Sequence, residues 1–173
     1  MMTDLTSTMP SGPELLQIGL RLLVALIVGA LVGLQRELTH KPAGLRTHML
    51  LSLGTALFLV AADESGMSKS DLSRVLQGLV TGIGFLGGGA ILKLTAEHEI
   101  HGLTTAAGLW LTAAAGAAAG LGRLGLAVVG VCLGLFVLSA FVKVEKALGL
   151  HSLDAANRPP GAAARKEPPG NGD

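Results

Sequence analysis

The sequence predicts an all-α fold of the membrane class, a polytopic bundle of about five transmembrane helices. Half of its 173 residues are hydrophobic and only 14% are charged. The mean hydropathy of +0.58 exceeds what a soluble domain of this size needs to fill a core. Five apolar stretches each approach the roughly 20 residues that cross the hydrocarbon core of a bilayer. Glycine is dense within them, which favours lipid as the solvent, because a helix in lipid must keep its backbone hydrogen bonds.

The five predicted helices follow one another closely along the chain. The second is the weakest, because Arg46 and His48 lie at its start. The fourth and fifth meet at 120–123, where Gly-Leu-Gly-Arg is typical of a tight turn between antiparallel helices. The predicted helices cover residues 15–34, 45–62, 72–94, 102–121 and 124–142.

The chain divides into three regions on this pattern. A short outer N-terminus (1–14) precedes the five-helix transmembrane domain (15–142). The last region (143–173) is expected to be a cytoplasmic, largely disordered tail, because proline, alanine and glycine accumulate in it. No lysine or arginine precedes the first apolar stretch, which is also too long for the core of a signal peptide, so we expect no cleavage.

The distribution of basic residues predicts the orientation. With the N-terminus outside and the C-terminus in the cytoplasm, nine lysines and arginines fall on the inner side and four on the outer side or in the first helix. Cytoplasmic loops of membrane proteins carry an excess of these residues. The inner set is Arg36, Lys41, Arg46, Lys93, Lys143, Lys146, Arg158, Arg165 and Lys166, and the outer set is Arg21, Lys69, Arg74 and Arg123.

Glycines recur at four-residue spacing, which places both members of a pair on one helix face and permits close helix contact. One interpretation is packing within a single bundle. The other is that a pair on the 72–94 helix forms a subunit interface or lines a cavity, with Gly82, Gly84, Gly87 and Gly88 shaping the contact. A bundle this small has little interior for an aqueous path, so we expect a homo-oligomer in the lipid bilayer. The pairs are Gly29/Gly33, Gly78/Gly82, Gly84/Gly88, Gly116/Gly120 and Gly130/Gly134.

Polar residues gather at the predicted inner ends of the helices. Arg36, Glu37 and Arg46 lie around the first inner loop, and Thr104 and Thr105 begin the fourth helix. The arginines suit anchoring to lipid phosphates, and the threonines suit helix capping. Alternatively, these five residues, which we call the inner-face cluster, form a functional site at the inner mouth of the bundle.

Three polar residues lie inside the apolar stretches. Arg21 is costly there unless it reaches the outer surface or pairs with Glu14, Asp63 or Asp71. Gln77 and Thr81, one turn apart, suit an interhelical hydrogen bond or a polar patch.

Several function classes find no support in the sequence. There is no nucleophile with a base and an acid, no phosphate-binding loop, and no pair of carboxylates inside the membrane, so we expect no enzymatic activity. We expect no metal site, because the inner histidines and glutamates show no ligand motif, and no cofactor. Nucleic-acid binding is not expected either, since aromatic platforms are missing.

Three motifs resemble the signatures of the MgtC/SapB family of bacterial inner-membrane proteins. The first is Gly29-x-x-x-Gly33 followed by Arg36-Glu37 and Pro42-Ala-Gly-Leu-Arg-Thr47. The second is the glycine-rich run 82–89, and the third is Gly-Leu-Thr-Thr-Ala-Ala-x-Leu-Trp at 102–110. With the five-span pattern, the resemblance covers roughly 15–142. It implies roles linked to magnesium limitation, acid stress or survival in macrophages, exerted in some members by regulating membrane machinery that includes ATP synthase.

The chain departs from the family pattern at three points. Gln35 stands where many members have Glu, His101 stands where Arg is usual, and the soluble C-terminal domain of longer members is not seen. We therefore expect a short form of the family. We expect it to be a regulator in magnesium or ion homeostasis or stress adaptation that acts through membrane partners, such as another membrane protein complex. The alternative is a small channel or carrier that moves an ion or small solute, with a hydrated cavity bounded by Gln77, Thr81 and Thr105.

Overall fold

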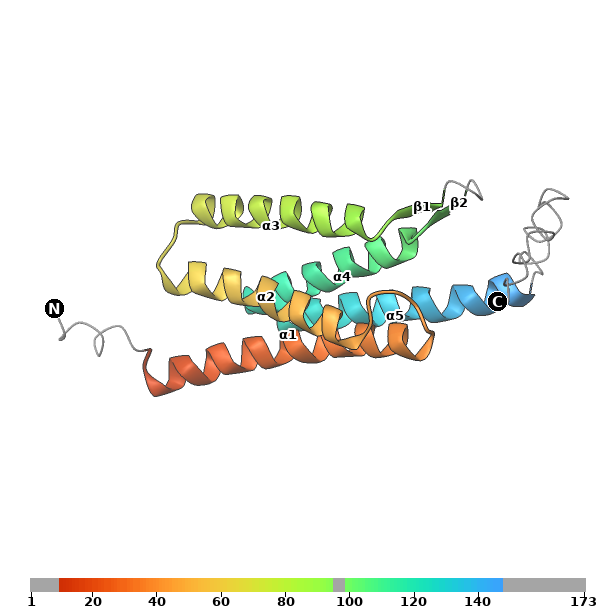
Figure 1. Ribbon diagram of the computed structural model, residues 1–173. Helices are drawn as coiled ribbons and strands as arrows, with labels where there is room; N and C mark the ends of the chain where they lie inside the picture. Colours follow the sequence, from red (N-terminus) through yellow and green to blue (C-terminus); the bar gives the residue numbers. More distant parts are fainter. Residues whose placement is uncertain (1–9, 95–98, 148–173) are drawn as a thin grey trace, which may run out of the picture. The chain divides into compact units, whose positions relative to one another are not determined.

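The predicted all-α class is confirmed in a computed structural model that describes residues 10–94 and 99–147 (Figure 1). The described part contains five helices and one short β-hairpin. By length and apolar composition, α1, α2 and α4 can each cross a membrane, and α5 contains the shorter apolar stretch Leu124–Ala140. The elements are α1 (Gly12–Leu38), α2 (Leu45–Glu64), α3 (Lys69–Gly89), β1 (Leu92–Leu94), β2 (Glu99–His101), α4 (Leu103–Gly120) and α5 (Leu124–Ala147).

The end of the third predicted helix was wrong. Helix α3 begins at Lys69 and ends at Gly89, and the chain then forms an antiparallel hairpin in which Leu92 pairs with His101 and Leu94 pairs with Glu99. The hydrophobic residues after the glycine run continue the apolar pattern, so the pattern alone does not mark the change. The run Gly87–Gly89 has low helix propensity, and strand pairing replaces the helix immediately beyond it.

The two ends of the predicted domain also shift. Helix α1 starts at Gly12, inside the segment that we predicted as the outer N-terminus, and α5 continues to Ala147, inside the predicted tail. Residues 1–9 and 148–173 of those two predictions lie outside the described residues. The chain falls into two compact units, 1–135 and 136–173, and the fold and the site below belong to the first.

The core of the first unit is a closely packed set of three helices, α1, α2 and α4. Helix α2 lies against a glycine pair on each of its two neighbours. A Cβ added at Gly29 would lie 2.7 Å from the carbonyl oxygen of His48, and one at Gly33 would lie 2.7 Å from the Cα of Leu45. On the other side, a Cβ at Gly120 would lie 2.7 Å from the carbonyl oxygen of Ala56. Packing within the bundle is therefore confirmed for Gly29/Gly33 and Gly116/Gly120.

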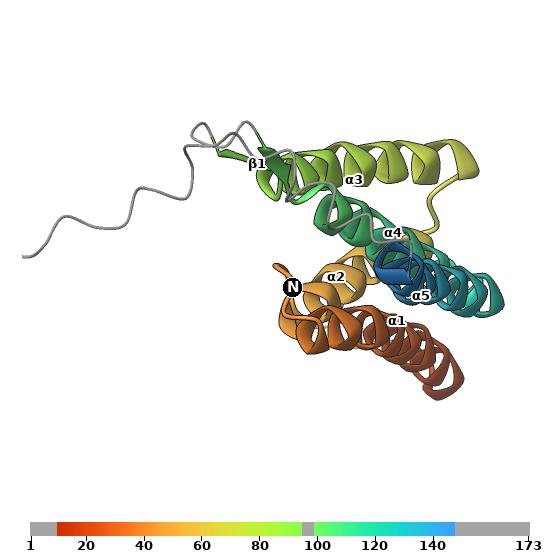
Figure 2. The same cartoon turned by 90° about the vertical axis from the view of Figure 1, so that its right-hand side faces the viewer.

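Helix α3 packs more loosely than the other three. Figures 1 and 2 both place it on the side of α2 and α4 that faces away from α1. Only Ile83 and Gly87 are buried among its residues. A Cβ added at Gly87 would be in van der Waals contact with the indole of Trp110 in α4, at 3.5 Å. Gly82, Gly84 and Gly88 have no atom of the described chain within 4 Å of an added Cβ. Their proposed role in helix contact therefore stays a prediction.

Candidate functional site

The most unusual residue of the described chain is Arg36, an arginine in the last turn of α1 that is only 3% exposed. Its Nη2 donates a hydrogen bond to the hydroxyl of Thr105, in the first turn of α4, and a longer one of 3.5 Å to the carbonyl oxygen of Pro42. Its Nε is buried and has no acceptor among the described residues. The structure thus brings together two members of the inner-face cluster, Arg36 and Thr105.

Glu37, the next residue, has a separate role. Its carboxylate accepts a hydrogen bond of 2.9 Å from the backbone N–H of Leu45, at the start of α2. The N-cap of that helix is Gly44, which has no side chain to serve as a cap, and a Cβ there would overlap the Glu37 carboxylate. A carboxylate at a helix N-terminus satisfies a free N–H and complements the helix dipole. Glu37 therefore caps α2 from the neighbouring helix.

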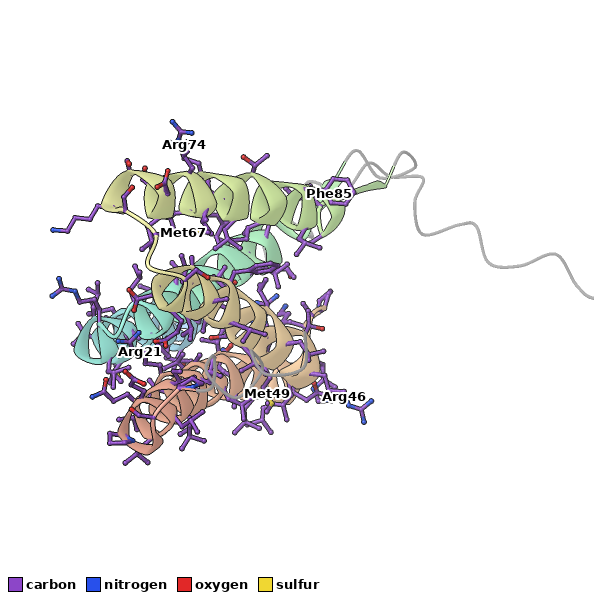
Figure 3. All side chains as sticks on the ribbon, turned by 90° about the vertical axis from the view of Figure 1, so that its left-hand side faces the viewer. Arg21, Arg46, Met49, Met67, Arg74 and Phe85 are labelled. Carbon is purple, nitrogen blue, oxygen red and sulfur yellow. The ribbon has the colours of Figure 1, made fainter. Side chains whose placement is uncertain are left out.

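The other two members of the inner-face cluster lie at the surface. Arg46 and Thr104 are exposed, and Figure 3 shows the Arg46 side chain extending away from the helices. Neither side chain forms a hydrogen bond within the described residues. The cluster is therefore not one contiguous site in the described chain: Arg36 and Thr105 form a buried contact, and Arg46 and Thr104 lie outside it.

A buried histidine extends the polar contact toward the middle of the bundle. His48 of α2 is completely buried, and its Nδ1 lies 2.7 Å from the hydroxyl of Thr112 in α4. The Thr112 hydroxyl also lies 2.9 Å from the carbonyl oxygen of Gly108, to which it can donate. Nε2 of His48 is buried without a hydrogen-bond partner among the described residues.

The sequence analysis missed this part of the site, because it treated His48 as a weakness of the second helix and as one of the inner histidines without a ligand motif. A usable signal was present. His48, Ser52 and Thr55 lie at spacings of four and three residues along α2, and all three are buried. Thr105 and Thr112 are seven residues apart in α4. Both spacings place polar groups on one helix face, which would have predicted a polar seam between α2 and α4.

The intramembrane polar residues fall into two groups. Arg21 forms an ion pair with Asp63 at 2.7 Å, which selects one of the three carboxylates considered from the sequence, and it lies 3.5 Å from the carbonyl oxygen of Gly120 (Figure 3). Gln77 and Thr81 are exposed on α3, and the Thr81 hydroxyl donates to the backbone carbonyl of Gln77 at 3.0 Å. That bond stays within α3, so it joins no two helices.

Two cavities lie beside α3, and Thr55 is the one hydroxyl-bearing residue in their otherwise apolar linings. The larger, of about 540 Å³, lies between α2 and α3, and its lining includes Gly78 and Gly82. The smaller, of about 330 Å³, lies between α3 and α4 and is bordered by Trp110. No charged residue lines either cavity, and neither is bounded by the polar residues Gln77, Thr81 and Thr105.

Metal ligands do not converge in the part of the chain that the structure describes. No group of three or more histidine, cysteine, aspartate or glutamate side chains there could hold a metal ion. Two of the inner residues that we considered as ligands, Glu97 and His98, lie outside the described residues.

Comparison with known proteins gives one family and several relatives. Residues 22–147 match the model of the MgtC family. The chain is 40% identical over 149 residues to the protein SrpB of Synechococcus elongatus, a match that covers 80% of this chain and 81% of SrpB. It is 39% identical over 132 residues to YhiD of Escherichia coli K12, covering 70% of this chain and 59% of YhiD.

A third relative is the protein MgtC of Salmonella typhimurium LT2, with 39% identity over 104 residues, covering 60% of this chain and 43% of MgtC. The chain thus matches most of SrpB but less than two thirds of YhiD and of MgtC. No solved structure matches the chain.

Proposed function

Because the chain belongs to the MgtC family, we propose that it acts in magnesium or ion homeostasis, or in adaptation to stress, in the inner membrane of a bacterium. The name of the relative YhiD describes it as a candidate magnesium transporter. The three long apolar helices support a membrane location. The excess of lysine and arginine on one side supports the orientation with the N-terminus outside and the C-terminus in the cytoplasm.

The proposed mode of action is regulation of a partner membrane protein, with no transport by the chain itself. The packing of α2 against glycines of α1 and α4 supports this mode, since contacts of 2.7 Å from an added Cβ leave no room for a hydrated ion between those helices. A path for a cation needs oxygen ligands or charged rings along its wall. The two cavities beside α3 have no charged lining residue and share one side-chain hydroxyl, that of Thr55.

The observation that carries the proposal is the buried contact of Arg36 with Thr105. A buried charge inside a membrane bundle is costly and is a functional hypothesis by default. It lies where α1 ends and α4 begins, at the proposed cytoplasmic end of the bundle. We therefore propose Arg36 and Thr105 as the centre of the functional site, with Arg46 and Thr104 as surface residues available to a partner.

Oligomerisation is the second element of the proposal. An added Cβ at Gly84 or Gly88 of α3 meets no other part of the described chain within 4 Å, and Phe85 between them is 82% exposed. Small residues at this spacing let a second helix approach closely in lipid. These glycines support a homo-oligomer in which α3 contacts a neighbouring copy.

A growth assay tests the regulatory role. A bacterial strain without its own MgtC-family protein would express the chain and be grown at limiting magnesium. We expect the wild type to restore growth, Arg36→Gln to lose this effect at equal membrane abundance, and Arg74→Gln, an exposed arginine of α3, to behave as the wild type (Figure 3). Equal growth of the Arg36→Gln and wild-type strains would contradict the proposal.

A small channel or carrier is the second candidate function, favoured by the name of YhiD. It requires a hydrated path that opens in a conformation different from the closely packed one. Measurement of flux in liposomes separates it from the regulator.

A further inference from the structure

The neighbouring residues Arg36 and Glu37 lie against the N-termini of two different helices. Glu37 accepts from the backbone N–H of Leu45 at the start of α2, whereas Arg36 donates to Thr105 at the start of α4. A helix N-terminus carries about half a positive charge. Glu37 therefore complements its helix, but Arg36 adds a full positive charge to the positive end of α4.

The first turn of α4 has free hydrogen-bond donors. Its N-cap, Gly102, has no side chain and adopts a φ of +95°, and a Cβ there would overlap the carbonyl oxygen of Ala90. The N–H of Ala106 donates to the carbonyl oxygen of Gly102, as in a regular helix. The N–H groups of Leu103, Thr104 and Thr105 have no acceptor within the described residues.

Among the described residues, the guanidinium of Arg36 also has unused donors and no ion-pair partner. Nη2 is engaged by Thr105 and Pro42, Nε is buried without an acceptor, and Nη1 has no acceptor in the described part of the chain. The ion pair found there, Arg21–Asp63, lies at the far ends of α2 and α4. Desolvating a cation without an opposite charge is strongly unfavourable, so this arrangement calls for an anion.

We propose that Arg36 and the first turn of α4 bind a phosphate group, either inorganic phosphate or the headgroup phosphate of a lipid. Helix N-termini bind phosphate through free N–H groups and the helix dipole, and the unused N–H donors of a guanidinium form charge-assisted hydrogen bonds with phosphate oxygens. Arg36 lies in the last turn of α1, after its long apolar stretch. The end of such a stretch is the level at which a membrane helix meets lipid headgroups. This inference gives a ligand to the site of the proposed function and rests on that site assignment.

Binding of inorganic phosphate to the purified full chain tests the proposal. In a neutral detergent, thermal unfolding is followed by the fluorescence of Trp110, with phosphate compared against chloride at equal ionic strength. We expect a saturable rise of the unfolding midpoint with phosphate. Arg36→Gln should bind phosphate at least about tenfold more weakly, because charge-assisted hydrogen bonds are lost. The matched control Arg74→Gln should bind as the wild type does.

Two outcomes would overturn the proposal. One is a wild-type chain whose midpoint does not respond to phosphate, and the other is an equal response in Arg36→Gln. If Arg36→Gln does not fold, Arg36→Lys keeps the charge and loses the fork of donors, so it should show weaker but measurable binding. A Lys variant that binds as tightly as the wild type would also count against the proposal.

Native mass spectrometry of the wild type with phosphatidylglycerol distinguishes the two sources of phosphate. A lipid ligand predicts one retained lipid per chain that inorganic phosphate displaces. A free-phosphate ligand predicts the thermal shift without retention of lipid. Either result supports the proposal. The absence of both lipid retention and a thermal shift contradicts it.

Two glutamates that precede α4 in the sequence, Glu97 and Glu99, provide a further control. Glu97 lies outside the described residues, and nothing is assigned to the side chain of Glu99. If phosphate binds only to the Glu97→Gln, Glu99→Gln double variant and not to the wild type, a carboxylate of the chain itself fills the site and the proposal is wrong. Because growth at limiting magnesium is scored separately, phosphate binding and the regulatory role can fail independently.

Discussion

The guanidinium of Arg36 is hydrogen-bonded to the hydroxyl of Thr105, which lies 69 positions further along the chain, and this bond joins the end of α1 to the start of α4. Both residues are buried, and the longer bond of Arg36 to the carbonyl oxygen of Pro42 is the other hydrogen bond of this guanidinium among the described residues. A neutral partner satisfies the donor geometry of the guanidinium without neutralising its charge.

Removing the Thr105 hydroxyl should destabilise the bundle. Thr105→Val keeps the shape of the side chain but leaves Nη2 of Arg36 without its buried acceptor, at a cost of about 1–3 kcal/mol. Thr105→Ser retains the hydroxyl and should cost less. Thermal unfolding of the purified variants measures the difference, and equal stability of the Val and Ser variants would show that the bond contributes nothing.

The glycines of α4 and α3 should respond in opposite ways to the same substitution. A Cβ at Gly116 would overlap the Ser52 carbonyl of α2, so Gly116→Ala should destabilise the bundle by about 1–3 kcal/mol through overpacking. Gly82→Ala of α3 meets open space in the chain and should be neutral or slightly stabilising, because alanine favours helix.

A variant at Gly84, which lines neither cavity, reports on oligomerisation. If Gly84→Ala lowers the unfolding midpoint or splits the oligomer in size-exclusion chromatography with light scattering, α3 contacts a second copy at this glycine. An unchanged oligomer would place the subunit interface elsewhere.

The hydrogen bond between His48 and Thr112 should contribute more to the free energy of unfolding than an exposed hydrogen bond does, because the imidazole is fully buried. Thr112→Val removes the hydrogen-bond partner of Nδ1, which leaves both nitrogens of a fully buried imidazole without a partner in the described chain, at a cost of about 1–3 kcal/mol. Thr112→Ser should restore most of the loss. A Val variant as stable as the wild type would indicate that His48 finds another partner.

The ion pair Arg21–Asp63 should contribute little. The two side chains are 22% and 45% exposed, and exposed pairs are typically worth about 0.2–1 kcal/mol. A double-mutant cycle with Arg21→Gln and Asp63→Asn, read by thermal unfolding, should give a coupling energy in that range. Coupling well above it would mean that the pair lies in an environment much less polar than its exposure indicates.

The sequence predicted the helical class and much of the helix order, because apolar length is a direct consequence of bilayer thickness. Two of the glycine pairs, Gly29/Gly33 and Gly116/Gly120, were also placed correctly in contacts within the chain. The end of α3 was not predictable from hydropathy, since Leu92–Leu94 is as apolar as a helix end and its structure depends on pairing with Glu99–His101.

The site was predictable only in part. Arg36 and Thr105 were both chosen as members of the inner-face cluster, but spacing along the chain could not tell which of the five residues touch. The distinction between Arg36, which points into the bundle, and Arg46, which points out, depends on the rotation of each helix about its axis. That rotation is fixed by the packing of glycine faces, as at Gly33 against Leu45.

Magnesium flux into liposomes that contain the purified chain tests the central claim most directly. The protein must first be shown to be folded and oriented, and Arg36→Gln serves as the matched variant. We predict that uptake of Mg²⁺ does not exceed that of protein-free liposomes. Uptake that saturates with concentration and disappears in Arg36→Gln would contradict the regulatory account and establish the chain as a transporter.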